Sequence, residues 1–531
     1  RRLVDAYTAG VNAGLASLGA SPFEYLILRA EPQPWRTEDT MLALVAMFFA
    51  LHDTDNRMES DLAVMTDTLP PSLLPFLAPP GTTWDTPLQG DSTPAPDLPT
   101  ADIVDLRRLP PALPQVSRRS VPLDAWFGSN NWAIAGRRTS HGGALLANDM
   151  HLGLRLPNTW YQAAMAWPAQ DGERQIIGVT LPGTPALVIG TNRRVAWGFT
   201  NSYGDWLDWV IVNPDPGDPG RYLTPAGPRV YEKVMERIAV RGGPPVDMTV
   251  VNTVWGPVAG KDHRGRLRAL RWTAHEPDGV NLRLMDLENA LNIDQALDWA
   301  ARCGIPPQNF VCADSTGRIG WTICGRIPRR AGFDGRRPVA WADGACRWDG
   351  WLSAAEFPRL SDPPSGMIWT ANNRVSAGDD LVRIGDSGYD LGARARQIRN
   401  GLAALSSADE GAMLQLQLDD QAVFLARWRS QVLKQLTPEA VAGHPDRAEF
   451  RRLVETGWTG RASTDSTGYR LVRAYRLTLL EQVYGWFIAP CRAADPDFGE
   501  SGRRQWEDVL WRLVTEQPPH LLDSRYRGWP E

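Results

Sequence analysis

Prolines are dense between residues 69 and 122, and this stretch limits what the 531-residue chain can fold into. Proline interrupts helices and sheets, and the stretch has few long apolar periods, so we expect a linker-like or irregular segment. It ends near Gly128-Ser129-Asn130-Asn131-Trp132, where a strand-like run begins. The chain is thereby divided into a first part, a spacer and a long second part.

The two parts differ in periodicity. Apolar residues recur at helical spacing from Val4 to Leu15, and Thr37-Glu38-Asp39 predicts a cap and an acidic first turn for a helix over residues 40–52. Beyond Ser129 short strand-like runs lie at 132–135, 144–147, 176–181, 186–189, 195–200 and 209–212. Helical patterns return at 294–301, 393–405, 414–436 and 469–487. Strands followed by helices indicate an α+β fold.

Charge and composition exclude several classes of function. With 56 Lys and Arg against 61 Asp and Glu, the net charge of −5 predicts no nucleic-acid partner and no membrane-binding face. The longest uncharged apolar run, 41–51, is well below the roughly 20 residues that span a bilayer. The five cysteines have no metal-binding spacing and are expected to be small buried hydrophobes. A small neutral or acidic substrate fits this balance.

Ser129 directly follows a glycine at the start of a strand-like run. If the Gly128–Ser129 bond were cut, the hydroxyl and a free α-amine would belong to one residue. An α-amine titrates near roughly 7.7 to 8, so around neutral pH it can take the hydroxyl proton, usually through a water. The alternative interpretation is a polar turn before a strand, with the proline-rich stretch as an ordinary interdomain linker.

A long ordered segment favours the first interpretation. The run SNNWAIAGRRTSHGGALLANDMHLGLRLPNTWYQAAM, continuing as LPGTPALVIGTNRRVAWGFTNSYGDWLDW, resembles the start of the catalytic chain in the penicillin acylase family of N-terminal nucleophile hydrolases. The resemblance implies a four-layer αββα sandwich of two antiparallel sheets between helical layers. It also implies a self-processing precursor: an α-chain part over 1–98, a spacer over 99–128 cut at its end, and a β chain over 129–531.

The same resemblance implies the catalytic residues. Ser129 is the expected nucleophile, and His151 falls where members carry histidine or glutamine, which orients the serine. The expected oxyanion donors are the main-chain N–H of Asn201 and the side chain of Asn309. Arg330 matches the family arginine that braces the site, although Arg329 is adjacent and a one-residue slip is open.

A structural calcium ion is also implied by the resemblance. Its expected ligands are Glu59, Asp205, Leu207 and Asp208, and hard carboxylate and carbonyl oxygens suit this ion. The alternative is that these acidic side chains are simply solvated. No organic cofactor is implied. The resemblance further predicts a periplasmic or secreted location, and α and β chains of one precursor as partners.

We therefore expect an amidase that removes an acyl group from a penicillin, a cephalosporin or a related N-acyl compound. The alternative substrate is an acyl-homoserine lactone. A second alternative is an unprocessed binding protein of the same fold, rich in aromatic side chains since the chain has 23 Trp. A conventional Ser/His/Asp hydrolase is disfavoured because no GxSxG motif occurs. Family members usually extend further at both ends, so we expect a fragment or a shortened member, and Trp255 stands where many relatives have histidine.

Overall fold

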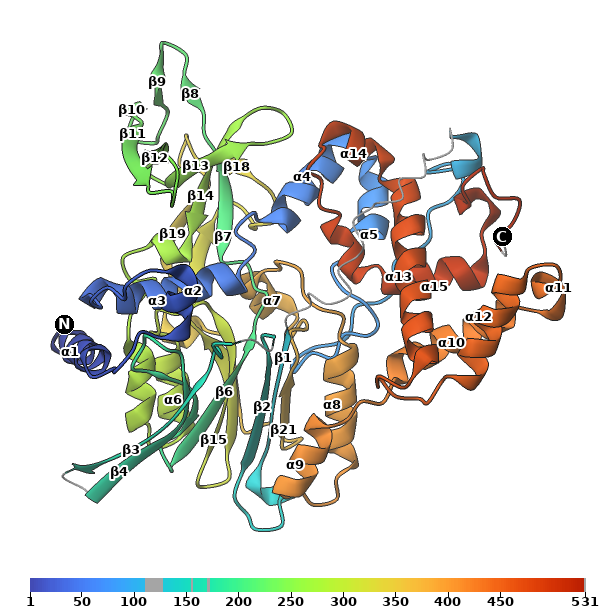
Figure 1. The fold of residues 1–531 in the computed structure, drawn as a ribbon. Helices are drawn as coiled ribbons and strands as arrows, with labels where there is room; N and C mark the ends of the chain where they lie inside the picture. Colours follow the sequence, from blue (N-terminus) through green and yellow to red (C-terminus); the bar gives the residue numbers. More distant parts are fainter. Residues whose placement is uncertain (110–127, 154–155, 170–171, 530–531) are drawn as a thin grey trace.

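The computed structural model describes residues 1–109, 128–153, 156–169 and 172–529 (Figure 1). The described helices are α1 (Arg2–Ala16), α2 (Phe23–Leu28), α3 (Thr37–Leu51), α4 (Arg57–Thr68), α5 (Leu74–Leu77), α6 (Ile293–Ala300), α7 (Gly378–Ile384), α8 (Ala393–Ala404), α9 (Glu410–Gln417), α10 (Val423–Gln435), α11 (Pro438–Val441), α12 (Pro445–Thr456), α13 (Thr467–Phe487), α14 (Ala489–Ala494) and α15 (Glu507–Glu516).

The described strands are β1 (Gly128–Ile134), β2 (Leu145–His151), β3 (Tyr161–Ala169), β4 (Gly172–Thr180), β5 (Leu187–Thr191), β6 (Val195–Asn201), β7 (Leu207–Ile211), β8 (Pro214–Asp215), β9 (Asp218–Tyr222), β10 (Arg229–Val230), β11 (Glu232–Ile238), β12 (Val246–Thr253), β13 (Gly256–Lys261), β14 (Leu267–Trp272), β15 (Gln308–Asp314), β16 (Ile319–Cys324), β17 (Pro328–Ala331), β18 (Val339–Ala340), β19 (Arg347–Trp351), β20 (Arg359–Ser361) and β21 (Met367–Thr370).

Two antiparallel sheets face each other at the centre of the molecule. One has seven strands in the order β20-β16-β15-β6-β5-β4-β3, and the other has three in the order β2-β1-β21. Apolar side chains such as Ala133, Val311 and Trp321 fill the space between them. Helix α6 covers the outer face of the larger sheet, while α8 and α9 cover the smaller one (Figure 1). These four layers form the α+β sandwich expected from the sequence.

A third sheet, with the order β11-β12-β13-β14-β7-β18, extends away from the sandwich (Figure 1). Its inner strands β7 and β14 are mostly buried, whereas β11 is exposed along its length. Strand β7 follows β6 after the short segment 202–206, so this sheet is connected to the sandwich close to Asn201.

The C-terminal helices form a separate apolar core with helices of the first part. Val64 and Met65 of α4 and Phe76 of α5 pack in the same cluster as Tyr484 of α13 and Leu510 of α15. The Trp506 indole N–H donates to the main-chain oxygen of Phe76 at 2.7 Å. The first and second parts of the chain therefore share one apolar core, and burial of its apolar surface stabilises their association.

Two local expectations differ from the structure. The helix expected over 414–436 is divided into α9 and α10, because the Asp419 carboxylate accepts the Gln421 N–H at 3.0 Å and forms a turn between them. Helix α3 begins at Thr37 rather than residue 40, and the Asp39 carboxylate caps it by accepting the Arg36 N–H at 2.7 Å. Residues 110–127 of the expected spacer lie outside the described residues. Among the residues described, no helix is long and apolar enough to span a membrane.

Candidate active site

Ser129 is the second residue of β1, between two strands of the smaller sheet. It lies opposite Met150 of β2, and two residues later Asn131 pairs with both Asn148 of β2 and Thr370 of β21. Ser129 is 8% exposed, at the edge of two cavities. The ladder fixes the backbone of Ser129 at the surface of the sandwich, where a substrate can reach its hydroxyl.

Two hydrogen-bond donors converge on the Ser129 hydroxyl. The Asn201 main-chain N–H, at the end of β6, donates to Ser129 Oγ at 3.2 Å. The Asn372 side-chain Nδ2 donates to the same oxygen at 3.1 Å. The Ser129 main-chain N–H in turn donates to Asn372 Oδ1 at 2.7 Å. One asparagine side chain therefore contacts both the nitrogen and the hydroxyl of Ser129.

Arg394, at the start of α8, donates hydrogen bonds to both Ser129 and Asn372. Its Nη1 donates to the Ser129 main-chain oxygen at 3.1 Å, and its Nη2 donates to Asn372 Oδ1 at 2.9 Å. The Asp390 carboxylate accepts from the same Nη2 at 2.7 Å. Asn372 itself has φ of +65°, a left-handed conformation that asparagine tolerates better than most residues.

Sequence reasoning missed both Asn372 and Arg394. The available signal was Thr370-Ala371-Asn372-Asn373-Arg374, a polar cluster directly after the apolar run Met367 to Trp369. Such a cluster at a strand end is typical of a functional loop. Nothing in the spacing indicated that a residue 243 positions from Ser129 would contact it.

His151 lies next to the expected cleavage point rather than at the serine hydroxyl. The β1–β2 ladder pairs it with Gly128, and its Nδ1 is 3.4 Å from the position that a Cβ on Gly128 would take. Its Nε2 is 3.6 Å from the Asp149 carboxylate, and the imidazole is 44% exposed. The nearby imidazole of His151 lowers the pKa of Asp149, which therefore stays ionised.

The structure places Asn309 away from Ser129, which corrects the expectation that its side chain is the second oxyanion donor. Asn309 is fully buried within β15, where it lies opposite Thr200 of β6. Its Oδ1 accepts from the Trp321 indole at 3.1 Å, and its Nδ2 has no partner among the described residues. The side-chain amide at Ser129 Oγ belongs to Asn372 instead.

Arg330 also lies elsewhere, on β17 among the residues expected to bind calcium. Its Nε is 2.9 Å from the Asp208 carboxylate and its Nη2 is 3.0 Å from the Asp205 carboxylate, with all three side chains buried. Burial lowers its pKa, but the carboxylates of Asp205 and Asp208 outweigh this and raise the pKa of Arg330 above its ordinary value. The arginine at Ser129 is Arg394.

Hydrogen-bond donors already contact most oxygens of the four expected calcium ligands, although Glu59 Oε1 is buried without a partner among the described residues. The Leu207 main-chain oxygen accepts from Asn56 Nδ2 at 3.1 Å, and Glu59 Oε2 accepts from Asn56 and from the Trp209 N–H. Calcium needs six to eight oxygens directed at one point. Here the guanidinium of Arg330 supplies positive charge between the carboxylates. Within the described ranges no group of three or more His, Cys, Asp or Glu is placed to hold a metal ion.

Two cavities meet at Ser129. The first has about 690 Å³ of space, part of it open to solvent, and is lined mostly by apolar side chains from α3, the β2 end and β5: Leu44, Met47, Leu51, Met150, Leu152 and Ile189, among others. The second, of about 560 Å³, is more polar and includes His52, Asp53, Tyr203 and Asn372. No Lys or Arg is among the described residues that line this second cavity. An apolar acyl group and a polar amine could thus lie on opposite sides of the hydroxyl.

The four layers and the position of Ser129 at the start of a central strand define the class of protein, an N-terminal nucleophile hydrolase fold. The model of the family described as Penicillin amidase matches residues 1–528, so the chain belongs to that family.

Known proteins similar to this chain include two kinds of acylase. The Penicillin acylase 2 proenzyme of Pseudomonas sp. (strain SE83) is 28% identical, over 100% of this chain and 70% of its own length. The acyl-homoserine lactone acylase QuiP of Pseudomonas aeruginosa is also 28% identical, over 88% of this chain and 57% of its own length. A solved structure, a thermostable penicillin G acylase from Alcaligenes faecalis, is 22% identical with a TM-score of 0.42 and covers 75% of this chain and 80% of that one. The chain spans between about half and 70% of the two Pseudomonas relatives.

Proposed function

We propose that this chain is a self-processing acylase, which cuts its own Gly128–Ser129 bond and then hydrolyses amides through Ser129. The observation that carries the proposal is that Asn201 and Asn372 both donate to Ser129 Oγ while Asn372 accepts from Ser129 N. Once that nitrogen is a free amine it can take the hydroxyl proton, and Asn372 keeps it beside the hydroxyl.

The reaction then follows from the same contacts. Ser129 Oγ attacks the substrate carbonyl, and the developing oxyanion is stabilised by the Asn201 N–H and Asn372 Nδ2. The C–N bond breaks as the leaving nitrogen takes the proton held by the α-amine. Water then attacks the acyl ester on Ser129, giving the acid and the free serine. Arg394 and Asp390 hold Asn372 and the Ser129 carbonyl in place throughout.

For the first step, cleavage of the precursor, the proposal assigns His151 a place beside the scissile bond. The backbone of His151 is paired with Gly128 in the ladder, and its Nδ1 is 3.4 Å from the position that a Cβ on Gly128 would take, so we assign the imidazole the transfer of a proton to or from the Gly128–Ser129 peptide group. The ionised carboxylate of Asp149 orients the ring.

The cavities favour an apolar acyl group, as in the N-acyl compounds named above. A second candidate substrate is an acyl-homoserine lactone, because acylases named for both kinds of substrate are similar to this chain. Calcium is not included in the proposal, because Arg330 already bonds Asp205 and Asp208. The proposal also includes a periplasmic or secreted location, which the family resemblance supports. Fractionation of the producing cells would test this location.

Ser129→Ala tests the proposal, with Ser466→Ala as a matched control. Ser466 is a buried serine of the C-terminal helical body, which comprises helices α10 to α15. Its hydroxyl accepts the Thr459 N–H at 3.2 Å. We expect intact mass to give two fragments for the parent and for Ser466→Ala, the larger beginning at Ser129, and one uncut chain for Ser129→Ala. A panel of penicillin, cephalosporin and acyl-homoserine lactones, assayed by acid release, identifies the substrate. Cleavage and hydrolysis by Ser129→Ala at the parent's rate would refute Ser129 as the nucleophile, whereas a parent chain that stays uncut and hydrolyses no member of the panel would favour a binding protein of the same fold.

A further inference from the structure

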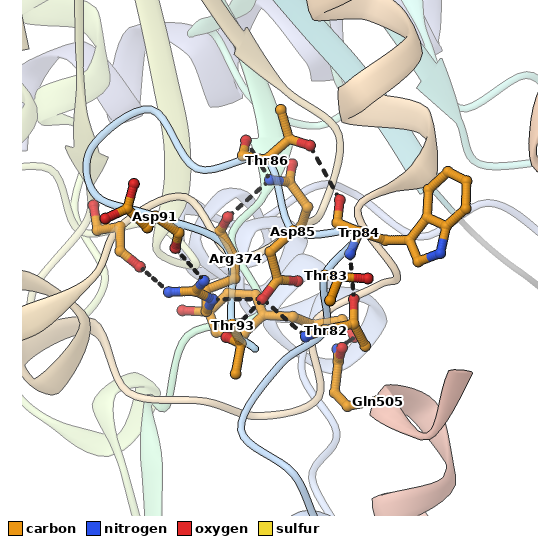
Figure 2. Close-up of polar contacts among 12 residues, drawn as sticks. Thr82, Thr83, Trp84, Asp85, Thr86, Asp91, Thr93, Arg374 and Gln505 are labelled. Carbon is orange, nitrogen blue, oxygen red and sulfur yellow. Dashed lines mark hydrogen bonds and ion pairs between the residues drawn. The ribbon is translucent and has the colours of Figure 1, made fainter. Parts of the chain in front are cut away.

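A segment of the first part of the chain wraps around the loop that carries Asn372. Figure 2 shows Arg374 between Asp91 and Asp85 of this segment, with polar contacts to both. The Asp85 carboxylate accepts from Arg374 Nε at 2.9 Å, from the Thr82 N–H at 3.0 Å and from the Thr93 hydroxyl at 3.0 Å. The side chains of Asp85 and Arg374 are 1% and 5% exposed. This is a buried ion pair with several partners.

Arg374 uses its guanidinium in three directions. Besides Asp85 it donates from Nη1 to the Ser376 main-chain oxygen at 3.0 Å and from Nη2 to the Asp91 main-chain oxygen at 2.8 Å (Figure 2). Because a guanidinium is planar and donates in fixed directions, these three hydrogen bonds restrain the neighbouring backbone more firmly than a single point charge would. The backbone after Asn372 is therefore held against residues 85–91.

The contacts continue on both sides of Asn372. The Asn373 side chain accepts the Ala371 N–H at 3.1 Å and donates to the main-chain oxygens of Arg374 and Thr86 at 2.8 and 3.3 Å. Before the loop, the Trp369 indole donates to the same Thr86 oxygen at 2.9 Å. A left-handed residue such as Asn372 persists where its surroundings determine its conformation. Here residues 85–93 supply those surroundings.

We propose that the Asp85–Arg374 ion pair is a positioning pair for the reaction: it holds the Asn372 side chain at Ser129 from the first part of the chain. This inference rests on the proposed function of Asn372 as a donor to the oxyanion. Neither member of the pair bonds Ser129, so each acts through Asn372. After cleavage at Gly128–Ser129 the pair would join two separate chains, and the α-chain part would complete the active site.

The test compares variants of the pair with a buried ion pair far from the site. Arg374→Met, Asp85→Asn and the milder Thr93→Val are made in the full chain, with Glu507→Gln as the control. Glu507 is fully buried in the C-terminal helical body and pairs with Arg476 and Arg427. We expect Arg374→Met to lower kcat by about 10- to 100-fold, because a small displacement of a catalytic group costs that much. KM is expected to stay within about twofold, since the pair lies outside both cavities. Asp85→Asn and Thr93→Val should show progressively smaller losses, and Glu507→Gln should keep the parent's kcat.

A double-mutant cycle with Asn372→Ala separates positioning from a general loss of stability. Rates are taken per cleaved enzyme, with the cleaved fraction from intact mass. For variants that cleave too slowly to give enough mature enzyme, the rate of cleavage is compared instead. If Arg374 acts through Asn372, Arg374→Met causes no further loss once Asn372 is alanine. Equal losses in both backgrounds, or a loss in Glu507→Gln as large as in Arg374→Met, would overturn the inference. If Asn372→Ala itself keeps the parent's rate, the proposed function fails instead.

Discussion

The side chain of Asn372 offers the sharpest test of the site, because a second buried asparagine serves as its control. Asn372→Ala removes the 3.1 Å donor to Ser129 Oγ and the 2.7 Å acceptor for Ser129 N. Loss of one oxyanion donor costs about 10² to 10³ in kcat, or about 2.7–4 kcal/mol. Because Asn372→Ala also removes the acceptor for Ser129 N, we expect a loss of kcat near the upper end of this range, about 10³-fold.

Asn309→Ala makes the same chemical change one strand away from the site. It removes the acceptor for the Trp321 indole at 3.1 Å, and an unpaired buried donor costs about 1–3 kcal/mol of stability. We therefore expect a lower unfolding midpoint with kcat within about threefold of the parent. The assay measures amine release from an N-acyl substrate after intact mass has given the cleaved fraction. A loss of kcat in Asn309→Ala equal to that in Asn372→Ala would refute our placement of the oxyanion donor.

Three further predictions concern acid stability, processing and metal. His52 is half-buried beside the polar cavity and accepts the Trp272 indole N–H at 2.9 Å, and the loss of hydration there lowers its pKa from 6.5 to about 3. The unfolded state then binds the proton more tightly, so stability falls as pH drops below about 6.5, by about 2 kcal/mol at pH 5. Denaturant unfolding of parent and His52→Gln at pH 7.5 and 5 should show the smaller loss in the variant. Asp149→Asn should slow precursor cleavage roughly 10-fold, because His151 loses its orienting carboxylate; an unchanged time course by intact mass would contradict this. EDTA should leave the thermal midpoint of the parent unchanged, whereas Arg330→Met should cost about 3–5 kcal/mol by leaving buried carboxylates unpaired; a midpoint lowered by EDTA would contradict the role of Arg330.

Periodicity predicted an α+β fold well because the strands are short, apolar and separated by turn residues, whereas the four-layer arrangement was implied by the family resemblance. The expected runs 132–135, 176–181 and 195–200 fall within or overlap β1, β4 and β6. Periodicity reports local burial, so it finds elements whose faces are apolar. It failed at Asp419, where a side chain bonds the backbone and ends a helix inside an apolar pattern.

The candidate site was predicted only in part, for a physical reason. Ser129 and Asn201 lie on adjoining faces of the two sheets, and the resemblance pointed to both. Asn309 and Asn372 are equally polar in sequence, but one lies within a buried strand and the other in a left-handed loop at the strand end. Which asparagine contacts Ser129 depends on how distant loops pack together, and no local pattern carries that information. The same holds for Arg330 and Arg394, two arginines with different carboxylate partners.

If the chain is cut as we propose, the position of Gly128 makes activity depend on the exact point of cleavage. Gly128 is paired with His151 in the ladder and also borders the polar cavity beside Ser129. A chain cut one residue too early would therefore carry its extra glycine into the space that the departing amine needs. Such a misprocessed enzyme would be blocked by its own end, so only molecules trimmed to the serine itself would ever turn over.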